Sequence, residues 1–350
     1  MTPPEEESTV SRSPDAGGRS RWRAAALIAL GLALLGALLW STDLSHVAGD
    51  VRTLGWWAPF ILVPYLVMGL VDAAAWRCTL PSRVRDVVPF AALYLTRLAG
   101  EAINSVTPTA TVGGEPVKAH MLRSWGVPGV DGLVSVVLAR TALVVAQSLF
   151  VALGVAALFV RLEQPGWAAT WLAVMLALTL AFATFLVWIQ LRNPALTAWR
   201  ALRRVFPRSR LLERAEAPAI LVDRGLDQFY RFEGHSFFWA TSLHLLGWLV
   251  GVWEVHLMMS LIGAPVSWLD AFVIEALAQP IRAVALVIPG GLGAQEWGGV
   301  LLCTRLGVPE ADAVTLWLLK RGRETIFDVV GLAYLGLRST RSLQRGEEPA

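Results

Sequence analysis

The stretch Val287-Ile288-Pro289-Gly290-Gly291-Leu292-Gly293-Ala294-Gln295-Glu296 decides how this chain folds. It follows an apolar segment long enough to enter a bilayer, yet it contains a proline and three glycines. These residue types interrupt an α-helix. Inside a membrane, interrupted backbone is tolerated only where protein or a water-filled cavity satisfies its polar groups. The stretch is therefore either a loop outside the membrane or a deliberate break within it.

The composition indicates a membrane protein. Of the 350 residues, 55% are hydrophobic and only 16% are charged, whereas soluble domains have about a quarter charged residues. The mean hydropathy is +0.55. Sixteen tryptophans suit a protein with two membrane interfaces, where indole rings are favoured. We therefore predict an all-α polytopic membrane protein.

Several classes of site are not expected. The net charge of +3 is not gathered in a basic domain, so nothing favours nucleic-acid binding. Cys78 and Cys303 lie in separate apolar regions and suggest neither a disulfide framework nor a metal site. His244 and His256 lack the i, i+4 spacing of helical metal sites. We expect no metal and no cofactor, and no nucleotide-binding motif is present.

Apolar length and arginine placement predict six full spans and two re-entrant hairpins. Arginine-rich segments belong in the cytoplasm by the positive-inside rule, and residues 191–235 hold nine arginines against five acidic residues. Both termini then lie in the cytoplasm. The predicted spans are 24–40, 56–76, 131–160, 167–190, 236–262 and 311–337, and the hairpins are 87–125 and 266–306.

A single transmembrane domain, residues 24–338, is expected between two cytoplasmic tails. Residues 1–23 are rich in Pro, Glu, Ser and Arg, which predicts disorder, and residues 339–350 form the second tail. Only Lys118 and Lys320 among the 30 basic residues are lysine. This bias favours a GC-rich bacterial genome and therefore the bacterial inner membrane.

The basic connection 191–235 contains an amphipathic segment. Its pattern suits an interfacial helix on anionic lipid. A solvated helix packed on neighbouring loops suits it equally well. The apolar residues at helical spacing are Leu196, Trp199, Leu202, Val205 and Phe206, and the opposite face carries Arg200, Arg203 and Arg204.

A shift of 181 residues aligns the chain with itself. Over 33 ungapped columns eight residues are identical, against about two or three expected by chance. The shift places repeat 1, residues 56–160, on repeat 2, residues 236–337, and the predicted topology runs the two in opposite directions. This predicts an inverted repeat, which many secondary transporters use to build a midplane site. Matched residues include Pro108 with Pro289, Glu115 with Glu296, and Arg140 with Arg321.

Each hairpin carries a polar stripe on its first arm. Residues three and four apart share a helix face. Ionisable groups at membrane depth normally face protein or water and often mark a pathway. The alternative is ion pairing that only holds a buried hairpin, but two stripes in matching places favour a polar groove. The stripes are Arg97, Glu101 and Asn104 in the first hairpin and Glu275, Gln279 and Arg282 in the second.

The hairpin tips bring glycines next to a glutamate. Backbone N–H groups exposed at a helix start suit a phosphate or carboxylate, and Lys118 adds a positive charge one turn after Glu115. Capping of the broken helix ends is the alternative role, and it is favoured for Glu296. The predicted breaks are Pro108, Gly113 and Gly114 in the first hairpin and Pro289, Gly290, Gly291 and Gly293 in the second.

Three segments carry a family resemblance: RLAGEAINSVTPTATVGGEPVKAHML (97–122), EALAQPIRAVALVIPGGLGAQEWGGVLL (275–302) and LLKRGRE (318–324). Together they resemble the flippase-like family, the transmembrane region of lysylphosphatidylglycerol synthase and its stand-alone relatives. The resemblance covers roughly residues 25–337 and is nearest to members encoded with hopanoid-biosynthesis genes. It implies a lipid-translocating or lipid-handling protein with two re-entrant segments. The synthase's soluble aminoacyl-transferring domain does not follow the last span, so lysyl transfer is not expected.

The resemblance points to the polar stripes, the two tips and one arginine of the last span. Carried over residue by residue, these positions are Arg97, Glu101, Asn104, Pro108, Gly113, Gly114, Glu115, Glu275, Arg282, Pro289, Gly290, Gly291, Gly293, Glu296 and Arg321.

These observations predict a transporter that moves an amphipathic lipid between leaflets, the lipid being a hopanoid or an anionic or polyprenyl-linked one. The expected partners are membrane lipids and lipid-biosynthesis enzymes, and the sequence specifies no oligomeric state. A membrane-embedded transferase acting on a lipid phosphate and a non-catalytic scaffold are the alternatives. The residues predicted to line the headgroup path are Arg97, Glu101, Asn104, Glu115, Lys118, Arg140, Glu275, Gln279, Arg282, Glu296 and Arg321.

The predicted topology is testable with reporter tags. Tags inserted at Gly49 and Gly263 should report the outside, because each follows an odd number of crossings from the cytoplasm. Tags at Ser209 and at the C-terminus should report the cytoplasm. A cytoplasmic signal at Gly263 would rule out the second re-entrant hairpin.

Overall fold

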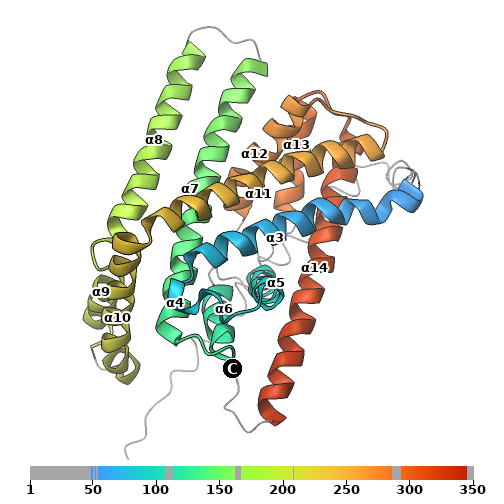
Figure 1. Cartoon of the computed structure of the whole chain (residues 1–350). Coiled ribbons are helices and arrows are strands. Elements are labelled where there is room, and N and C mark those ends of the chain that lie inside the picture. The colour runs from blue at the N-terminus through green and yellow to red at the C-terminus, as the bar shows by residue number, and fades with distance from the viewer. Residues whose placement is uncertain are drawn as a thin grey trace, which may run out of the picture.

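The computed structural model describes residues 49, 52, 54–106, 113–161, 167–207, 209–285 and 293–344. Every regular element within these residues is helical (Figure 1), which confirms the all-α prediction. The elements are η1 Gly55–Ile61, α3 Leu62–Thr79, α4 Ser82–Arg85, α5 Phe90–Val106, α6 Gly114–Arg123, α7 Gly129–Arg161, α8 Trp167–Gln190, α9 Pro194–Val205, α10 Arg210–Phe232, α11 Gly234–Leu261, α12 Trp268–Ala285, α13 Ala294–Arg305 and α14 Glu310–Gln344.

Several predicted features lie outside the described residues. They are the span 24–40, the tail 1–23, and the breaks Pro108, Pro289, Gly290 and Gly291.

Three described helices are long and apolar enough to cross a membrane: Gly55–Thr79, Gly129–Arg161 and Gly234–Leu261. They agree with the predicted second, third and fifth spans. Helix α8 has the bounds predicted for the fourth span, 167–190. The count of six spans stays a prediction.

Helix α14 is longer than the predicted last span 311–337 and runs into the predicted tail 339–350. No proline or glycine interrupts the chain between Gly336 and Gly346, so nothing in the sequence ends the helix earlier.

The two predicted hairpins are each a longer helix followed by a shorter one. Helix α6 has 10 residues and α13 has 12, which correspond to about 15 and 18 Å at 1.5 Å per residue. Neither length crosses a hydrocarbon core of about 30 Å. Helix α6 packs against α5, and α13 packs against α12. These lengths agree with counting neither hairpin as two full crossings.

The helix bounds follow the 181-residue shift. Adding 181 moves Gly55–Thr79 to 236–260, beside α11 at 234–261. The same addition moves α6 and α7 to 295–304 and 310–342, which nearly coincide with α13 and α14. The contacts between the two halves match in the same way. Helix α5 of the first half packs on α14 of the second, and its counterpart α12 packs on α7 of the first.

The two halves also point in opposite directions in space. In Figure 1, α7 ends at the top of the view and α14 ends at the bottom, and α6 lies low where α13 lies high. Helices α3 and α11 lie side by side across the middle of the molecule. This arrangement is the one expected of an inverted repeat, although its orientation in a membrane stays a prediction.

The segment at 191–235 folds into α9 and α10, which pack together. The Asp223 carboxylate of α10 accepts the N–H groups of Ala195 and Leu196, each at 2.9 Å, and so caps the start of α9. Leu202, Val205 and Phe206 remain exposed. Exposed apolar residues beside arginines are what the interfacial interpretation requires, and the contact between α9 and α10 is what the solvated interpretation requires.

Close helix contacts depend on glycine. A Cβ at Gly331 of α14 would overlap the backbone oxygen of Leu98 in α5, and a Cβ at Gly154 of α7 would overlap Ala276 in α12. These two interfaces, α5 with α14 and α7 with α12, join one half of the molecule to the other. The halves are therefore held together by backbone approach as well as by side-chain packing.

Substitution of Gly331 tests this packing. Gly331→Ala should destabilise the protein by about 1–3 kcal/mol, because the added methyl group meets backbone that cannot rotate away. Gly336→Ala is the matched control in the same helix, since a Cβ there meets nothing within 4 Å, and it should be neutral or stabilising by up to about 1 kcal/mol. Unfolding in mixed detergent micelles measures both. Equal effects of the two substitutions would contradict the interface.

Candidate functional site

A first polar cluster lies where five helices meet around one cavity. The cavity has a volume of about 40 Å³. Its polar lining, which we call the first cluster, consists of Asp72 from α3, Arg97 and Glu101 from α5, Glu115 and Lys118 from α6, Arg140 from α7 and His244 from α11. The predicted residues Arg97, Glu101, Glu115, Lys118 and Arg140 are thus brought together.

Asp72 is the link between three of these helices. Its Oδ2 accepts a hydrogen bond from Arg97 at 2.5 Å, and its Oδ1 lies 2.8 Å from His244 Nδ1. A Cβ at Gly247 would approach Asp72 Oδ1 to 3.2 Å, so the glycine allows α11 to lie close against α3. Neither Asp72 nor His244 belongs to the predicted stripes, and sequence spacing does not reveal their contact.

Lys118 joins the two arms of the first hairpin. Its Nζ donates to Glu101 at 2.7 Å and to Glu115 at 3.2 Å. The lysine side chain lies over Gly100, where a Cβ would approach Lys118 Cδ to 2.9 Å. Glu115 therefore binds a cation of its own helix.

Asn104 has a structural contact. Its Oδ1 accepts the backbone N–H of Gly114 at 2.7 Å, and so satisfies a donor at the start of α6. A Cβ at Gly114 would overlap the backbone oxygen of Gly100, so this position requires glycine. Asn104 shares a face with Glu101 as predicted, but its oxygen holds the hairpin arms together.

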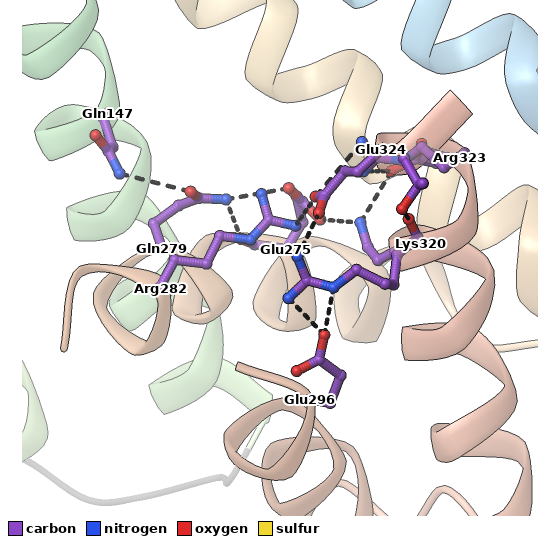
Figure 2. Close-up of polar contacts among 11 residues, drawn as sticks. Gln147, Glu275, Gln279, Arg282, Glu296, Lys320, Arg323 and Glu324 are labelled. Carbon is purple, nitrogen blue, oxygen red and sulfur yellow. Dashed lines mark hydrogen bonds and ion pairs between the residues drawn. The ribbon is translucent and has the colours of Figure 1, made fainter. Parts of the chain in front are cut away.

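A second polar cluster lies between α11, α12, α13 and α14 (Figure 2). Figure 2 shows its side chains converging from these helices. We call this set the second cluster: Glu254 from α11, Glu275, Gln279 and Arg282 from α12, Glu296 from α13, and Lys320, Arg321, Arg323 and Glu324 from α14.

The centre of the second cluster is fully buried. Lys320 Nζ donates to Glu254 at 2.9 Å and to Glu275 at 2.7 Å. Arg323 Nε lies 2.7 Å from Glu254, and its guanidinium stacks 3.9 Å above the Tyr65 ring. Side chains of Lys320 and Arg323 are 1% exposed. These residues hold helices together and are closed to solvent.

The edge of the second cluster is more open. Arg321 Nε donates to Glu296 at 2.6 Å and its NH1 lies 3.5 Å from Glu324. Arg282 makes a single 3.5 Å ion pair with Glu324. The side chains of Arg282 and Arg321 are 23% and 25% exposed. Glu296 therefore pairs with a cation, and its predicted capping role at the tip stays a prediction.

Two further predicted positions have local roles. Gln279 donates to the Glu275 side chain and backbone oxygen, each at 3.1 Å, and lies 3.5 Å from Gln147 of α7. Gly293, at the start of α13, has φ of 74°, a left-handed conformation that favours glycine. Gly113 has an ordinary right-handed conformation, so it needs no glycine for its backbone angles.

The chain matches the family described as lysylphosphatidylglycerol synthase TM region over residues 25–331. It belongs to this family. The chain is also similar to the UPF0104 membrane protein of Methanothermobacter thermautotrophicus. The two are 24% identical over 237 residues, which cover 65% of this chain and 70% of that protein. No solved structure matches.

Both clusters of this family member are formally neutral. The first contains three acids (Asp72, Glu101, Glu115) and three permanent bases (Arg97, Lys118, Arg140). The second contains four acids (Glu254, Glu275, Glu296, Glu324) and four bases (Arg282, Lys320, Arg321, Arg323). Buried charge is costly unless paired. An anion that enters either cluster would therefore compete with these carboxylates for their cations.

The two histidines of α11 do not meet. His244 contacts Asp72, whereas His256 Nδ1 lies 2.9 Å from the Val266 backbone oxygen and its ring stacks on Trp268 at 4.0 Å. In the described part of the chain, no group of three or more His, Cys, Asp or Glu side chains is placed to hold a metal ion.

The buried lysine gives a stability prediction. Lys320→Met should destabilise the protein by about 3–5 kcal/mol, because Glu254 and Glu275 would share a buried site without their common cation. Adding Glu275→Gln to Lys320→Met should recover part of this loss. Arg231→Met removes an exposed pair with Asp227 and should cost little. Detergent unfolding measures all three, and equal stability of Lys320→Met and Arg231→Met would contradict the assignment.

Proposed function

We propose that this protein moves an amphipathic lipid between the leaflets of a membrane. The observation that carries the proposal is Arg282. Its guanidinium comes from the first arm of the second hairpin. Among the described residues its buried Nε has no hydrogen-bond partner, and its NH2 has no hydrogen bond but lies 3.5 Å from Glu324 in an ion pair. Buried donors without an acceptor are unfavourable. A lipid headgroup with phosphate or hydroxyl oxygens would satisfy them.

The headgroup path would use bases of both clusters. Arg97 and Lys118 would line its first half, and Arg282 and Arg321 its second half. Each of these cations has a carboxylate partner in the structure, so the acids would hold them in place when no lipid is bound. The acyl or polycyclic tail would stay in the surrounding lipid.

Placement in the cell follows from the charge pattern. We propose the bacterial inner membrane with both termini in the cytoplasm, because the arginine-rich segments then lie inside. The cargo would be a hopanoid or an anionic or polyprenyl-linked lipid, supplied by lipid-biosynthesis enzymes. The family name comes from a synthase, but the proposal for this chain is movement of a lipid without chemical change.

Reconstitution distinguishes the candidate functions. The purified full chain would be placed in liposomes containing head-labelled phosphatidylglycerol, a labelled hopanoid or a labelled polyprenyl phosphate. A membrane-impermeant quencher then reports movement, and mass spectrometry reports chemical change. Movement without change supports transport. A modified lipid would instead favour the transferase, and neither result would favour the scaffold.

Two substitutions test the path. Arg282→Ala and Glu115→Gln should each slow translocation by about tenfold or more, since each removes one charge-assisted contact worth roughly 1.5–3 kcal/mol. Arg231→Ala, at an exposed pair outside the clusters, should leave the rate unchanged. Unchanged rates for both cluster variants, with normal yield and unfolding, would remove the path from consideration.

A further inference from the structure

The imidazole of His244 is held in one orientation by its surroundings. The ring is 5% exposed, and Nδ1 lies 2.8 Å from Asp72 Oδ1. The other oxygen of Asp72 binds Arg97, so this carboxylate is ionised and acts only as an acceptor. Nδ1 must then carry the hydrogen. In the neutral ring, Nε2 is left with a lone pair.

That lone pair lies at the cavity of the first cluster. His244 lines the cavity, and its Nε2 is buried without a hydrogen-bond partner among the residues that the structure describes. The volume of about 40 Å³ corresponds to about three water-sized spheres. A buried acceptor beside such a polar space is placed to receive a hydrogen bond or a proton.

Charged groups face the imidazole from every helix around the cavity. They are Asp72 from α3, Arg97 and Glu101 from α5, Glu115 and Lys118 from α6, and Arg140 from α7. Among these acids, Glu101 has the most exposed side chain, at 33%. A proton can therefore reach the cavity from solvent beside Glu101.

We propose that His244 binds the proton that drives lipid movement, so that proton and anionic headgroup occupy the first cluster together. This inference rests on the proposed function, because a coupled proton needs a cargo. It names the coupling ion, which neither the family match nor the charged stripes specify.

The coupling follows from competition for one carboxylate. A proton taken from water on one side binds the Nε2 lone pair and gives an imidazolium that still donates from Nδ1 to Asp72. The formal charge of the cluster rises from zero to +1. Asp72 then faces two cations, so Arg97 is held less strongly and becomes available to an anionic headgroup.

The reverse step completes the cycle. When the headgroup leaves on the other side, Arg97 returns to Asp72, and the proton passes from Nε2 to water there. Because linkage is reciprocal, a bound anion favours the proton as much as the proton favours the anion. Each turnover then moves one proton with one lipid.

A pH gradient across liposomes tests the coupling in the wild-type chain. Vesicles of phosphatidylcholine with a trace of head-labelled phosphatidylglycerol would carry the protein, and an impermeant quencher would follow the label. A gradient of about two pH units should change the initial rate about fivefold or more. Label movement that ignores the gradient would overturn the proton site and leave the proposed function standing.

The matched variants are on one helix. His244→Gln keeps a donor for Asp72 but cannot take a proton, so the response to the gradient should disappear. His256→Gln changes a histidine that contacts the Val266 backbone oxygen instead, and its gradient response should match the wild type. A gradient response retained by His244→Gln would overturn the inference.

A spectroscopic measurement tests the proton site independently of transport. With ¹⁵N-labelled histidine, His244 should show a protonated Nδ1 and an unprotonated Nε2 under alkaline conditions, and two protonated nitrogens under acidic conditions. If no labelled lipid moves, the proposed function fails and this titration alone decides the proton site. An imidazole that keeps one form across the range overturns it.

Discussion

Charge inside a membrane protein has to be neutralised by a partner, and this requirement sets which helices face one another. Lys320 shows the effect most directly. One ammonium group on α14 binds Glu254 on α11 and Glu275 on α12, so three helices converge on a single atom. In the other half, Asp72 on α3 likewise binds α5 and α11. Apolar packing fills the space between helices, but in lipid it distinguishes poorly between neighbours. The ion pairs determine which helices become neighbours.

Features that depend on local sequence were predicted well. The bounds of α8 and the helical stripes of α5 and α12 follow from apolar length and from residues spaced three and four apart. The short second arms α6 and α13 follow from the glycine-rich breaks before them. The 181-residue shift also anticipated the correspondence of helix bounds, because matched sequence imposes matched local structure.

The individual partners that join different helices were mostly not predicted. Spacing places Arg97 and Glu101 on one face, but Arg97 binds Asp72 of another helix. His244 was considered only as a metal ligand, and Arg323 was not singled out at all. A charged residue in an apolar helix indicates that a partner is needed, but the sequence does not show which helix provides that partner. For Asn104, the polar stripe suggested a path, whereas its oxygen binds the backbone of Gly114.

The formal neutrality of the two clusters has an electrical consequence. A membrane voltage acts on net charge, with about 2.3 kcal/mol per elementary charge for each 100 mV. Three acids against three bases, or four against four, move no net charge when they shift as a unit across the field. Voltage therefore exerts no net force on either cluster while it is empty. Only what the clusters bind, and the charge it carries, lets the membrane potential push the protein one way.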